Sequence, residues 1–526
     1  MILKMYKHIR SNIANHDTLT LSVVLFLTAL AVRIIIFFQW PVISNDAVFY
    51  VTLAKSILLG GSEHTDSSSF FSIYPFLIAF AYKVIPNWEI AGKAVSILSG
   101  SLAVIPLFIL FSKLMDKRIA IIAGFLYVFG PRFVEYSTDI LRESTFWLFF
   151  FTSLCCAWRG IYGMRLFYMT LAVVFAGLSF ATRIEGIAIF PIIVLWICFA
   201  VYSKEISLKN GIKTFAVLAL IILVLLLSVI MFIDHGSWSW VLEKFLEKGK
   251  YLLEDKVVFN LQVNNVEAVR DLPFSIRLLY ELAEKYKYLI FTAEIIFKTL
   301  KSMTFIPVIL LMAGLFLRKT IPFTRNEIYL IIWVGTFFIV SIYYMKGTNY
   351  FSTRHGLLLG IPALAFAGAG LLELKTKISN GFSRLKGSPG LVKPILAALI
   401  FLIFITLFIQ SITSLREDKM GLRSAGIELK QKGFGGSVLV IQPSLGRLAF
   451  YADSDYVTMQ EKIYVEDLVN VMKANKANIL VVNLDTIEKV VTNFDKITSS
   501  LQFNRIEFKC KKDNLQKSLA VYQYMP

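Results

Sequence analysis

Apolar runs of about 20 residues recur along most of this 526-residue chain and constrain its fold more than any other feature. A helix needs about 20 consecutive apolar residues to cross the hydrocarbon core of a bilayer. Residues 19–38, 213–233 and 394–413 are runs of this kind. Because hydrophobic residues make up 56% of the chain and charged residues only 17%, a soluble fold would have too little polar surface. The sequence therefore predicts a polytopic α-helical membrane protein.

The number of spans depends on residues 69–85, an apolar stretch that holds Tyr74, Pro75 and Lys83. Short cytoplasmic loops of membrane proteins are enriched in Lys and Arg. If residues 69–85 lie on the outer surface, every basic cluster in a short loop falls on one side of the membrane. We therefore predict eleven spans, with the N-terminus inside and the C-terminus outside. The expected spans are residues 19–38, 90–112, 119–135, 144–158, 166–181, 186–202, 213–233, 303–317, 326–345, 355–373 and 394–413.

The net charge of +18 follows from the same sorting, because the inner loops collect the basic clusters. No nucleic-acid partner is predicted from it. The inner clusters lie within residues 4–10, 113–118, 159–165, 204–213, 318–325 and 375–393. The outer face receives the acidic and mixed-charge motifs, and we expect the functional site there.

The chain turns polar after the last predicted span. SVLVIQ (437–442) and NILVVN (478–483) have the composition of short buried strands, and a helical pattern lies between them at 464–476. This alternation predicts a small α/β domain outside the membrane. The expected organisation is a transmembrane domain over residues 1–414, with outer loops at 39–88 and 234–302, followed by a soluble extracytoplasmic α/β domain over residues 415–526.

Asp46 is the first carboxylate after the first predicted span, in the motif NDAVFYVTLAKSILLGG. Asn45 or Asp46 could cap the helix that this motif predicts, because both residue types accept hydrogen bonds from first-turn N–H groups. Alternatively, the carboxylate acts as a general base on an acceptor hydroxyl at the membrane surface. The residues alone leave both interpretations open.

Three acidic residues recur four apart in PRFVEYSTDILRES, namely Glu135, Asp139 and Glu143. On one helix they would share a face, where like charges repel each other unless a cation lies among them. Arg132 and Arg142 are candidates for that cation. A bound divalent metal ion or a polar substrate is the alternative.

Charged residues also interrupt the apolar runs of ATRIEGIAIFP and NYFSTRHGLLLGIPAL. A charged residue at the bilayer centre costs about 2.5–3.5 kcal/mol on insertion scales, so such residues persist where they are paired or functional. Arg183 and Glu185 in the first motif fit this description. Arg354 in the second motif suits a lipid phosphate, because a guanidinium binds phosphate oxygens bidentately. An interfacial anchor is the alternative role for Arg354.

Taken in order, these motifs resemble those of the superfamily of protein O-mannosyltransferases and lipid A aminoarabinose transferases, which have the GT-C fold. The resemblance covers about residues 19–375. The chain departs from the pattern at Asn45, which precedes Asp46 where many relatives carry two adjacent acids. The matching motifs are NDAVFYVTLAKSILLGG, the Tyr-Pro segment SIYPFLIAFAYKVIP, the basic turn FSKLMDKR, LRES, TRIEG and the arginine before a late span.

The resemblance implies a GT-C-like membrane fold with about 11 transmembrane helices, in which Asp46 is the catalytic base. It implies that Glu143 is a second acidic site residue, with Asp139 as a competing assignment. The residues implied to bind the substrate or the lipid phosphate, or to shape the site, are Arg354, Arg183, Glu185, Arg142, Tyr50, Tyr74 and Lys83. No cofactor is assigned with certainty, and a divalent cation is the one candidate.

The predicted function is a membrane glycosyltransferase, either hexosyl- or pentosyltransferase, that moves a sugar from a polyprenyl-phosphate donor to an extracytoplasmic hydroxyl. The acceptor is a protein, a lipid or a glycan. The expected partners are the donor, the acceptor and membrane lipids, and the expected location is a bacterial or archaeal plasma membrane with the site outside. The alternatives are a transporter or flippase of a lipid-linked saccharide and a non-catalytic scaffold. No internal repeat of the kind that builds many transporters is visible.

Overall fold

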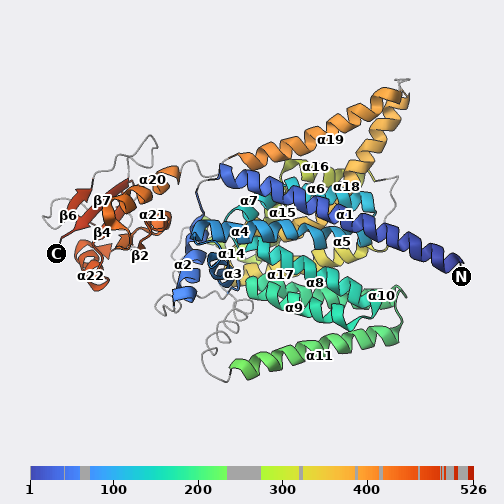
Figure 1. The fold of residues 1–526 in the computed structure, drawn as a ribbon, viewed down its shortest axis with the longest axis horizontal. Helices are drawn as coiled ribbons and strands as arrows, with labels where there is room; N and C mark the ends of the chain where they lie inside the picture. The colour runs from blue at the N-terminus through green and yellow to red at the C-terminus, as the bar shows by residue number, and fades with distance from the viewer. Residues whose placement is uncertain are drawn as a thin grey trace.

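The structure, a computed structural model, describes residues 2–40, 42–59, 72–233, 274–318, 324–384, 389–413, 419–459, 463–485, 487, 491–492, 503–506 and 519–525. A bundle of long helices and a smaller strand-containing domain are the two parts of the fold (Figure 1). The N-terminus lies at the end of the bundle remote from the strand-containing domain (Figure 1).

The helical part runs from the N-terminus to residue 412. Its helices are α1 (Ile2–Gln39), α2 (Asn45–Leu59), α3 (Tyr74–Tyr82), α4 (Trp88–Leu102), α5 (Val104–Leu114), α6 (Lys117–Phe129), α7 (Pro131–Thr138), α8 (Glu143–Gly163), α9 (Leu166–Thr182), the 3-10 helix η1 (Ile184–Ala188), α10 (Ile189–Tyr202), α11 (Leu208–Ile233), α14 (Phe274–Lys285), α15 (Lys287–Met303), α16 (Phe305–Phe316), α17 (Glu327–Thr348), α18 (Thr353–Arg384) and α19 (Pro389–Ile412).

Each of the eleven apolar runs predicted to span is occupied by a helix or by consecutive helices. Among the described residues, six helices are long and apolar enough to cross a membrane, and two bent helix pairs raise the number to eight if each pair is one span. The predicted class, a polytopic α-helical membrane protein, is confirmed, and the count of eleven stays a prediction. The six helices cover Asp17–Gln39, Trp88–Leu114, Ile184–Tyr202, Glu327–Thr348, Thr353–Gly381 and Pro394–Ile412.

Residues 69–85 do not form a spanning helix in the part that the structure describes. Their helix α3 has nine residues, which is about 13 Å and well short of the 30 Å hydrocarbon core. Pro75 lies in its first turn, where a missing N–H costs nothing. Of the predicted outer loops, residues 60–71 and 234–273 lie outside the described residues.

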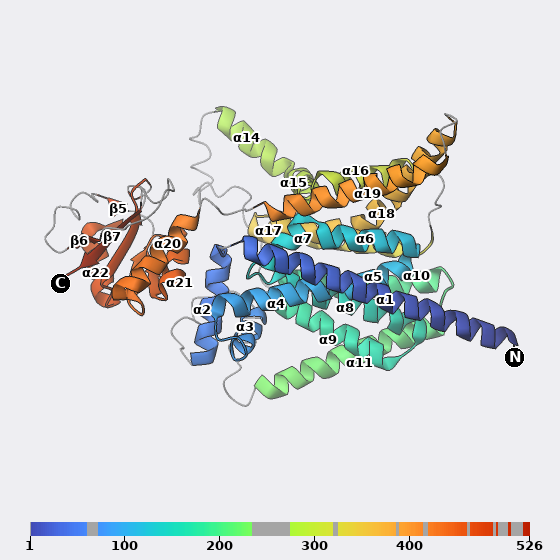
Figure 2. The ribbon, with the colours of Figure 1, turned by 45° about the horizontal axis from the view of Figure 1, so that its top comes forward.

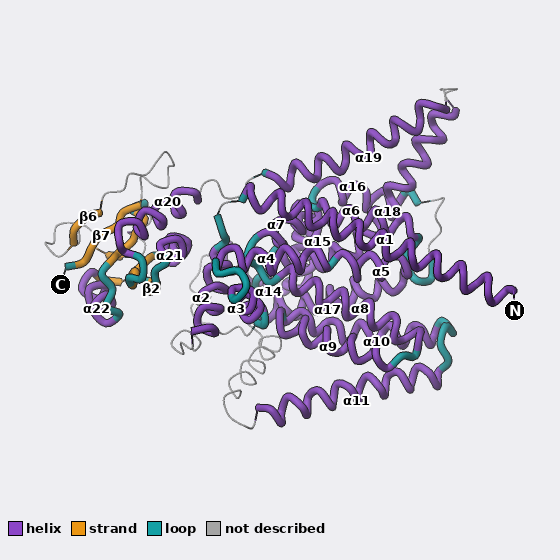
Figure 3. The backbone as a smooth tube through the Cα atoms, viewed as in Figure 1, coloured by secondary structure: helices purple, strands orange, loops and turns teal. Residues whose placement is uncertain are grey.

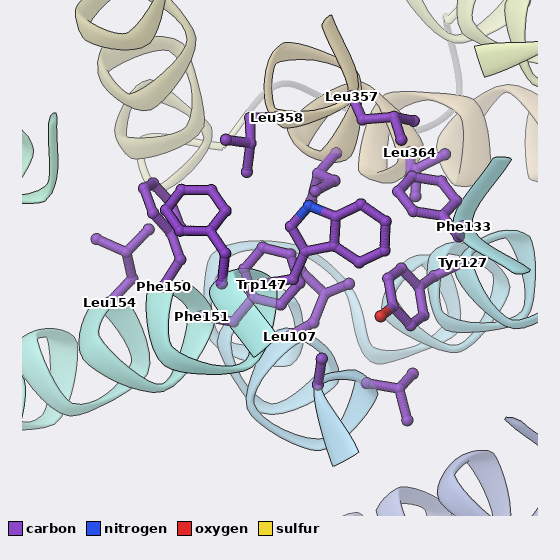
Figure 4. Packing of buried hydrophobic residues seen from close by; sticks show 14 of the residues in the cluster. Leu107, Tyr127, Phe133, Trp147, Phe150, Phe151, Leu154, Leu357, Leu358 and Leu364 are labelled. Carbon is purple, nitrogen blue, oxygen red and sulfur yellow. The ribbon is translucent and has the colours of Figure 1, made fainter. Parts of the chain in front are cut away.

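Large aromatic side chains fill the centre of the bundle. Trp147 of α8 packs edge-on against Phe133 of α7, with ring centroids 5.5 Å apart, and Phe133 packs in turn on Tyr127 of α6 at 4.9 Å. Leu357 and Leu364 of α18 close the same cluster (Figure 4). Residues far apart in the sequence meet in this one core. The core fixes where the ends of α7, α8 and α18 lie.

The second part of the fold is the predicted α/β domain. Its elements are α20 (Met420–Leu429), the π-helical turn η3 (Lys430–Phe434), β1 (Val438–Ile441), η4 (Pro443–Leu445), α21 (Gly446–Ala452), β2 (Asp455–Thr458), β3 (Ile463–Tyr464), α22 (Val465–Ala474), β4 (Ile479–Asn483), β5 (Val491–Thr492), β6 (Phe503–Ile506) and β7 (Leu519–Tyr524). The predicted strands at 437–442 and 478–483 are β1 and β4, and the predicted helix between them contains α22. The predicted boundary after residue 414 falls outside the described residues.

The main sheet has five strands in the order β2-β1-β4-β7-β6. β1 pairs in parallel with β2 and β4, whereas β7 pairs antiparallel with β4 and β6. Successive residues of β4 alternate between two cores, because side chains of a strand point to opposite faces. Ile479 and Val481 join the core under α20 and α21, and Leu480 and Val482 join the core under α22.

The helices α20 and α21 lie between the sheet and the helical bundle, on the side of α2 (Figures 2 and 3). The two parts share buried contacts, since Tyr451 of α21 belongs to the core cluster of the bundle. The strand-containing domain is therefore packed against the end of the bundle from which α2 projects.

α16 and α18 approach each other at backbone distance. A Cβ added at Gly370 would lie 1.9 Å from the carbonyl oxygen of Leu310, and one at Gly314 would lie 2.0 Å from that of Phe366. Small residues permit such close packing between membrane helices. The glycines at this contact are therefore required by sterics.

We expect Gly370→Ala to destabilise the protein, because even one methyl group overlaps the backbone of α16. Overpacking of this kind typically costs about 1–3 kcal/mol. The matched control is Gly335→Ala in α17, where an added Cβ meets nothing within 4 Å and alanine gains about 1 kcal/mol of helix propensity. Thermal unfolding in detergent should give a Tm below that of the wild type for Gly370→Ala only. Equal Tm values for both variants would contradict the close contact.

Candidate active site

Asp46 stands in the first turn of α2, and the helix start explains its position. The side chain of Ser44 caps the helix by accepting a hydrogen bond from the N–H of Ala47 at 3.2 Å. The Asp46 carboxylate forms an ion pair with Arg354 instead. Of the two sequence interpretations of Asp46, the geometry favours an ionic role over capping.

Arg354 lies in the first turn of α18, and its guanidinium joins three parts of the chain. Nη1 contacts the carboxylate of Asp46 and lies 3.8 Å from Glu143 Oε1. The guanidinium carbon is 5.7 Å from the centre of the Tyr136 ring. The Tyr136 hydroxyl is hydrogen-bonded to the hydroxyl of Thr353 at 3.0 Å. Contacts from α2, α7 and α8 thus fix a guanidinium whose side chain remains 31% exposed.

A buried arginine links the two acids predicted from LRES and TRIEG. Arg183 donates through Nη1 to Glu143 Oε1 at 2.5 Å and through Nη2 to Glu185 Oε1 at 2.6 Å. Its Nε donates to the second oxygen of Glu185 at 3.3 Å, which makes that pair bidentate. Burial by itself would lower the pKa of Arg183, but the two carboxylates raise it above its ordinary value. Arg183 therefore stays charged between the two carboxylates.

The TRIEG turn brings Arg183 and Glu185 into this arrangement. α9 ends at Thr182, and Arg183 has an extended backbone (φ −145, ψ 142) before the 3-10 helix η1 starts. A Cβ at Gly186 would lie 2.4 Å from the backbone nitrogen of Phe180. Only glycine fits this tight turn of the chain. The turn places the side chains of Arg183 and Glu185 next to each other.

His355 is a site residue that the sequence analysis missed. Its Nε2 lies 3.1 Å from Glu185 Oε1, and its Nδ1 accepts a hydrogen bond from the backbone N–H of Ser352 at 3.1 Å. A backbone N–H can only donate, so Nδ1 is the acceptor and Nε2 carries the proton that is donated to Glu185. The only sequence signal was its position directly after Arg354.

Glu135, Asp139 and Glu143 do not share one helical face, contrary to the sequence expectation for a single helix. α7 ends at Thr138 and α8 begins at Glu143, so the helix is broken between them. Glu135 pairs with Arg132 at 2.5 Å. Oδ1 of Asp139 accepts hydrogen bonds from the backbone N–H groups of Ile140 at 2.8 Å and Ser44 at 3.3 Å.

Of the remaining candidates, Arg142, Tyr50 and Tyr74 line the same region. The Arg142 guanidinium lies 5.9 Å from the Tyr50 ring, and the rings of Tyr50 and Tyr74 meet edge to face at 5.2 Å. Burial raises the pKa of Tyr50 to about 12, so its phenol is neutral. Lys83 is exposed at the far end of α3, about 13 Å along the helix from Tyr74, and is not brought into the cluster.

The arrangement is a partly exposed ion pair, Asp46 with Arg354, next to a buried cluster in which Arg183 pairs with two carboxylates. Among the described residues, no group of three or more His, Cys, Asp or Glu side chains has a geometry suited to a metal ion. The exposed part offers one carboxylate for a proton and one guanidinium for an anion. These are the groups that a transfer between a hydroxyl and a phosphate leaving group needs.

Residues 72–232 match the family model described as dolichyl-phosphate-mannose-protein mannosyltransferase. This segment contains Glu143, Arg183 and Glu185 from the site. Comparison of the sequence with curated proteins gave no significant match.

Solved structures of two kinds resemble the whole fold. ArnT from Cupriavidus metallidurans, in a complex with undecaprenyl phosphate, superposes with a TM-score of 0.55 and 12% identity over 95% of this chain and 97% of that one. The archaeal oligosaccharyltransferase AglB from Archaeoglobus fulgidus, in a complex with an inhibitory peptide and a dolichol-phosphate, gives 0.53 and 14% over 90% of this chain and 70% of that one.

These likenesses show that the protein has the GT-C fold, with a small C-terminal α/β domain. It is an integral membrane protein. The family-model match and the fold together support a membrane glycosyltransferase. The predicted fold class is thereby confirmed.

We expect Arg183→Met to destabilise the protein strongly, because it leaves Glu143 and Glu185 buried without their shared cation. Breaking a buried ion pair from one side typically costs about 3–5 kcal/mol. The matched control is Lys298→Met, which removes a partly exposed pair with Glu294 and should cost at most about 1 kcal/mol. Thermal or denaturant unfolding of both variants measures the difference. Similar losses would show that the Arg183 cluster is not held by charge.

Proposed function

We propose that this protein transfers a sugar from a polyprenyl-phosphate donor to a hydroxyl of an extracytoplasmic acceptor. The observation that carries the proposal is the ion pair between Asp46 and Arg354, which joins the first outer segment to the start of a late span. It is the accessible end of the charge cluster. A hexose or a pentose, and a protein, lipid or glycan acceptor, are all compatible with it.

The greater exposure of Asp46 supports it, over the two competing acids, as the base. The Asp46 side chain is 46% exposed, whereas that of Glu143 is 3% exposed and paired with Arg183. Asp139 is buried and accepts backbone hydrogen bonds. A base must reach the proton that it removes, and Asp46 alone of the three offers that access.

The ion pair also indicates the order of steps in the proposed transfer. The donor phosphate is an anion and competes with Asp46 for Arg354, so donor binding releases the Asp46 carboxylate. Asp46 then accepts the proton of the acceptor hydroxyl, while the oxygen of that hydroxyl bonds to the sugar carbon. The bond from that carbon to the phosphate oxygen breaks, and its electron pair leaves with the polyprenyl phosphate. Arg354 stabilises the charge that develops on this leaving group.

The proposal places the site and the C-terminal domain on the outer face of a bacterial or archaeal plasma membrane. Its support is the sorting of Lys and Arg into the other set of loops. A reporter enzyme that is active only outside the cytoplasm, fused at the C-terminus, should be active. A fusion with a reporter that works only in the cytoplasm should be silent. The reverse pair of signals would overturn the orientation.

The chemical test is Asp46→Asn, assayed with labelled polyprenyl-phosphate sugars. Asparagine keeps the size of the side chain, and Ser44 rather than Asp46 caps α2, so we expect less than about 1 kcal/mol change in stability. Loss of a general base typically costs about 10²–10⁴-fold in rate. Transfer should fall by that factor while the donor still binds.

Arg354→Lys is the companion variant, because it keeps the charge and loses the fork of the guanidinium. It should weaken donor binding partly, whereas Arg354→Ala should weaken it more. Normal transfer by Asp46→Asn would show that Asp46 is not the base. Normal donor binding by both Arg354 variants would reduce Arg354 to an anchor.

A further inference from the structure

The C-terminal domain contacts the segment that carries Asp46 at two separate points. The ring of Tyr451 is part of the bundle core, and its hydroxyl oxygen accepts a hydrogen bond from the backbone N–H of Ile43 at 3.1 Å. Further along α2, Lys55 pairs with Asp453 at 3.3 Å. The domain therefore holds both the entrance to α2 and a later turn of the same helix.

Two consecutive backbone N–H groups ahead of α2 are bonded to different parts of the molecule. The N–H of Ile43 donates to Tyr451 of the C-terminal domain, and the N–H of Ser44 donates to Oδ1 of Asp139 in the bundle at 3.3 Å. Asp46 follows two residues later. These two hydrogen bonds, one to each domain, are called the clamp. The clamp consequently sets the direction in which the Asp46 carboxylate points.

We propose that Tyr451 is a positioning residue for sugar transfer: it fastens the segment 43–46 to the C-terminal domain and thereby holds Asp46 opposite Arg354. The proposal rests on the proposed function, since it takes Asp46 as the base. It gives the C-terminal domain a part in positioning the catalytic carboxylate.

The surroundings of Tyr451 suit this role. The guanidinium of Arg423 in α20 lies 5.4 Å from the ring centre, which fixes the ring from the side of the C-terminal domain. Burial raises the pKa of Tyr451, so the hydroxyl stays neutral and its oxygen remains an acceptor. Ile43 is fully buried, so its N–H cannot turn to bulk water if the hydroxyl is removed.

Loss of this hydroxyl should therefore displace the segment rather than leave a buried donor unpaired. Misplacement of a catalytic group by about 1 Å can cost up to 10²-fold in rate. We expect Tyr451→Phe to lower kcat for transfer about tenfold. The donor KM should change by less than about twofold, because phenylalanine keeps the packing and Arg354 stands on α18.

The test compares Tyr451→Phe with Tyr456→Phe in the full-length protein. Tyr456 lies in β2 of the same domain and packs against the same core, and the structure records no hydrogen bond of its hydroxyl among the described residues. Backbone amide exchange is measured by mass spectrometry for peptides that contain residues 42–48. Tyr451→Phe should raise exchange there and lower kcat, and Tyr456→Phe should leave both at wild-type values.

Three results would overturn the proposal. These are wild-type exchange in Tyr451→Phe, raised exchange with wild-type kcat, and equal effects of both tyrosine variants. The exchange measurement does not depend on which residue is the base. Normal transfer by Asp46→Asn together with raised exchange in Tyr451→Phe would therefore refute the base while leaving the clamp in place.

Discussion

The charge cluster around Arg183 is the interaction on which the site depends. A buried carboxylate is costly unless a cation and hydrogen bonds compensate it, and Arg183 compensates two. Those two acids come from the starts of α8 and η1. His355 adds the start of α18 to the same cluster through Glu185. Three helix starts are thereby held at one point, and the exposed ion pair rests on that point.

Interrupted helices are the means by which these charges reach the site. α6 and α7 meet at 52° where Gly130 and Pro131 follow each other, and α9 gives way to η1 at Arg183. Uninterrupted apolar helices would carry their polar residues only at distant ends. Each break instead places charged side chains inside the protein, where Arg183 pairs with Glu143 and Glu185.

Much of this could be read from the sequence. Apolar runs predicted the helical segments and the C-terminal strands, and the resemblance carried by the order of the motifs implied that Asp46 and Arg354 belong to one site. The break between Asp139 and Glu143 could not be predicted, because the spacing of four fits a continuous helix equally well. Tyr451 contacts Ile43 across 408 positions, and no local pattern encodes such a contact. Lys83 shows the converse: motif order alone suggested a role that its position on α3 does not support.

The close glycine contacts of α18 have a consequence for movement. Added Cβ atoms at Gly356, Gly368 and Gly370 would meet backbone atoms of α15, α6 and α16 within 3 Å. Because α18 is in backbone contact with three helices, it can neither slide along its axis nor turn about it without separating them. Arg354 is therefore held at a constant depth, and in the proposed reaction it receives the lipid phosphate at that depth. Any opening and closing during a reaction cycle must therefore come from the segments that face α18, while Arg354 stays in place.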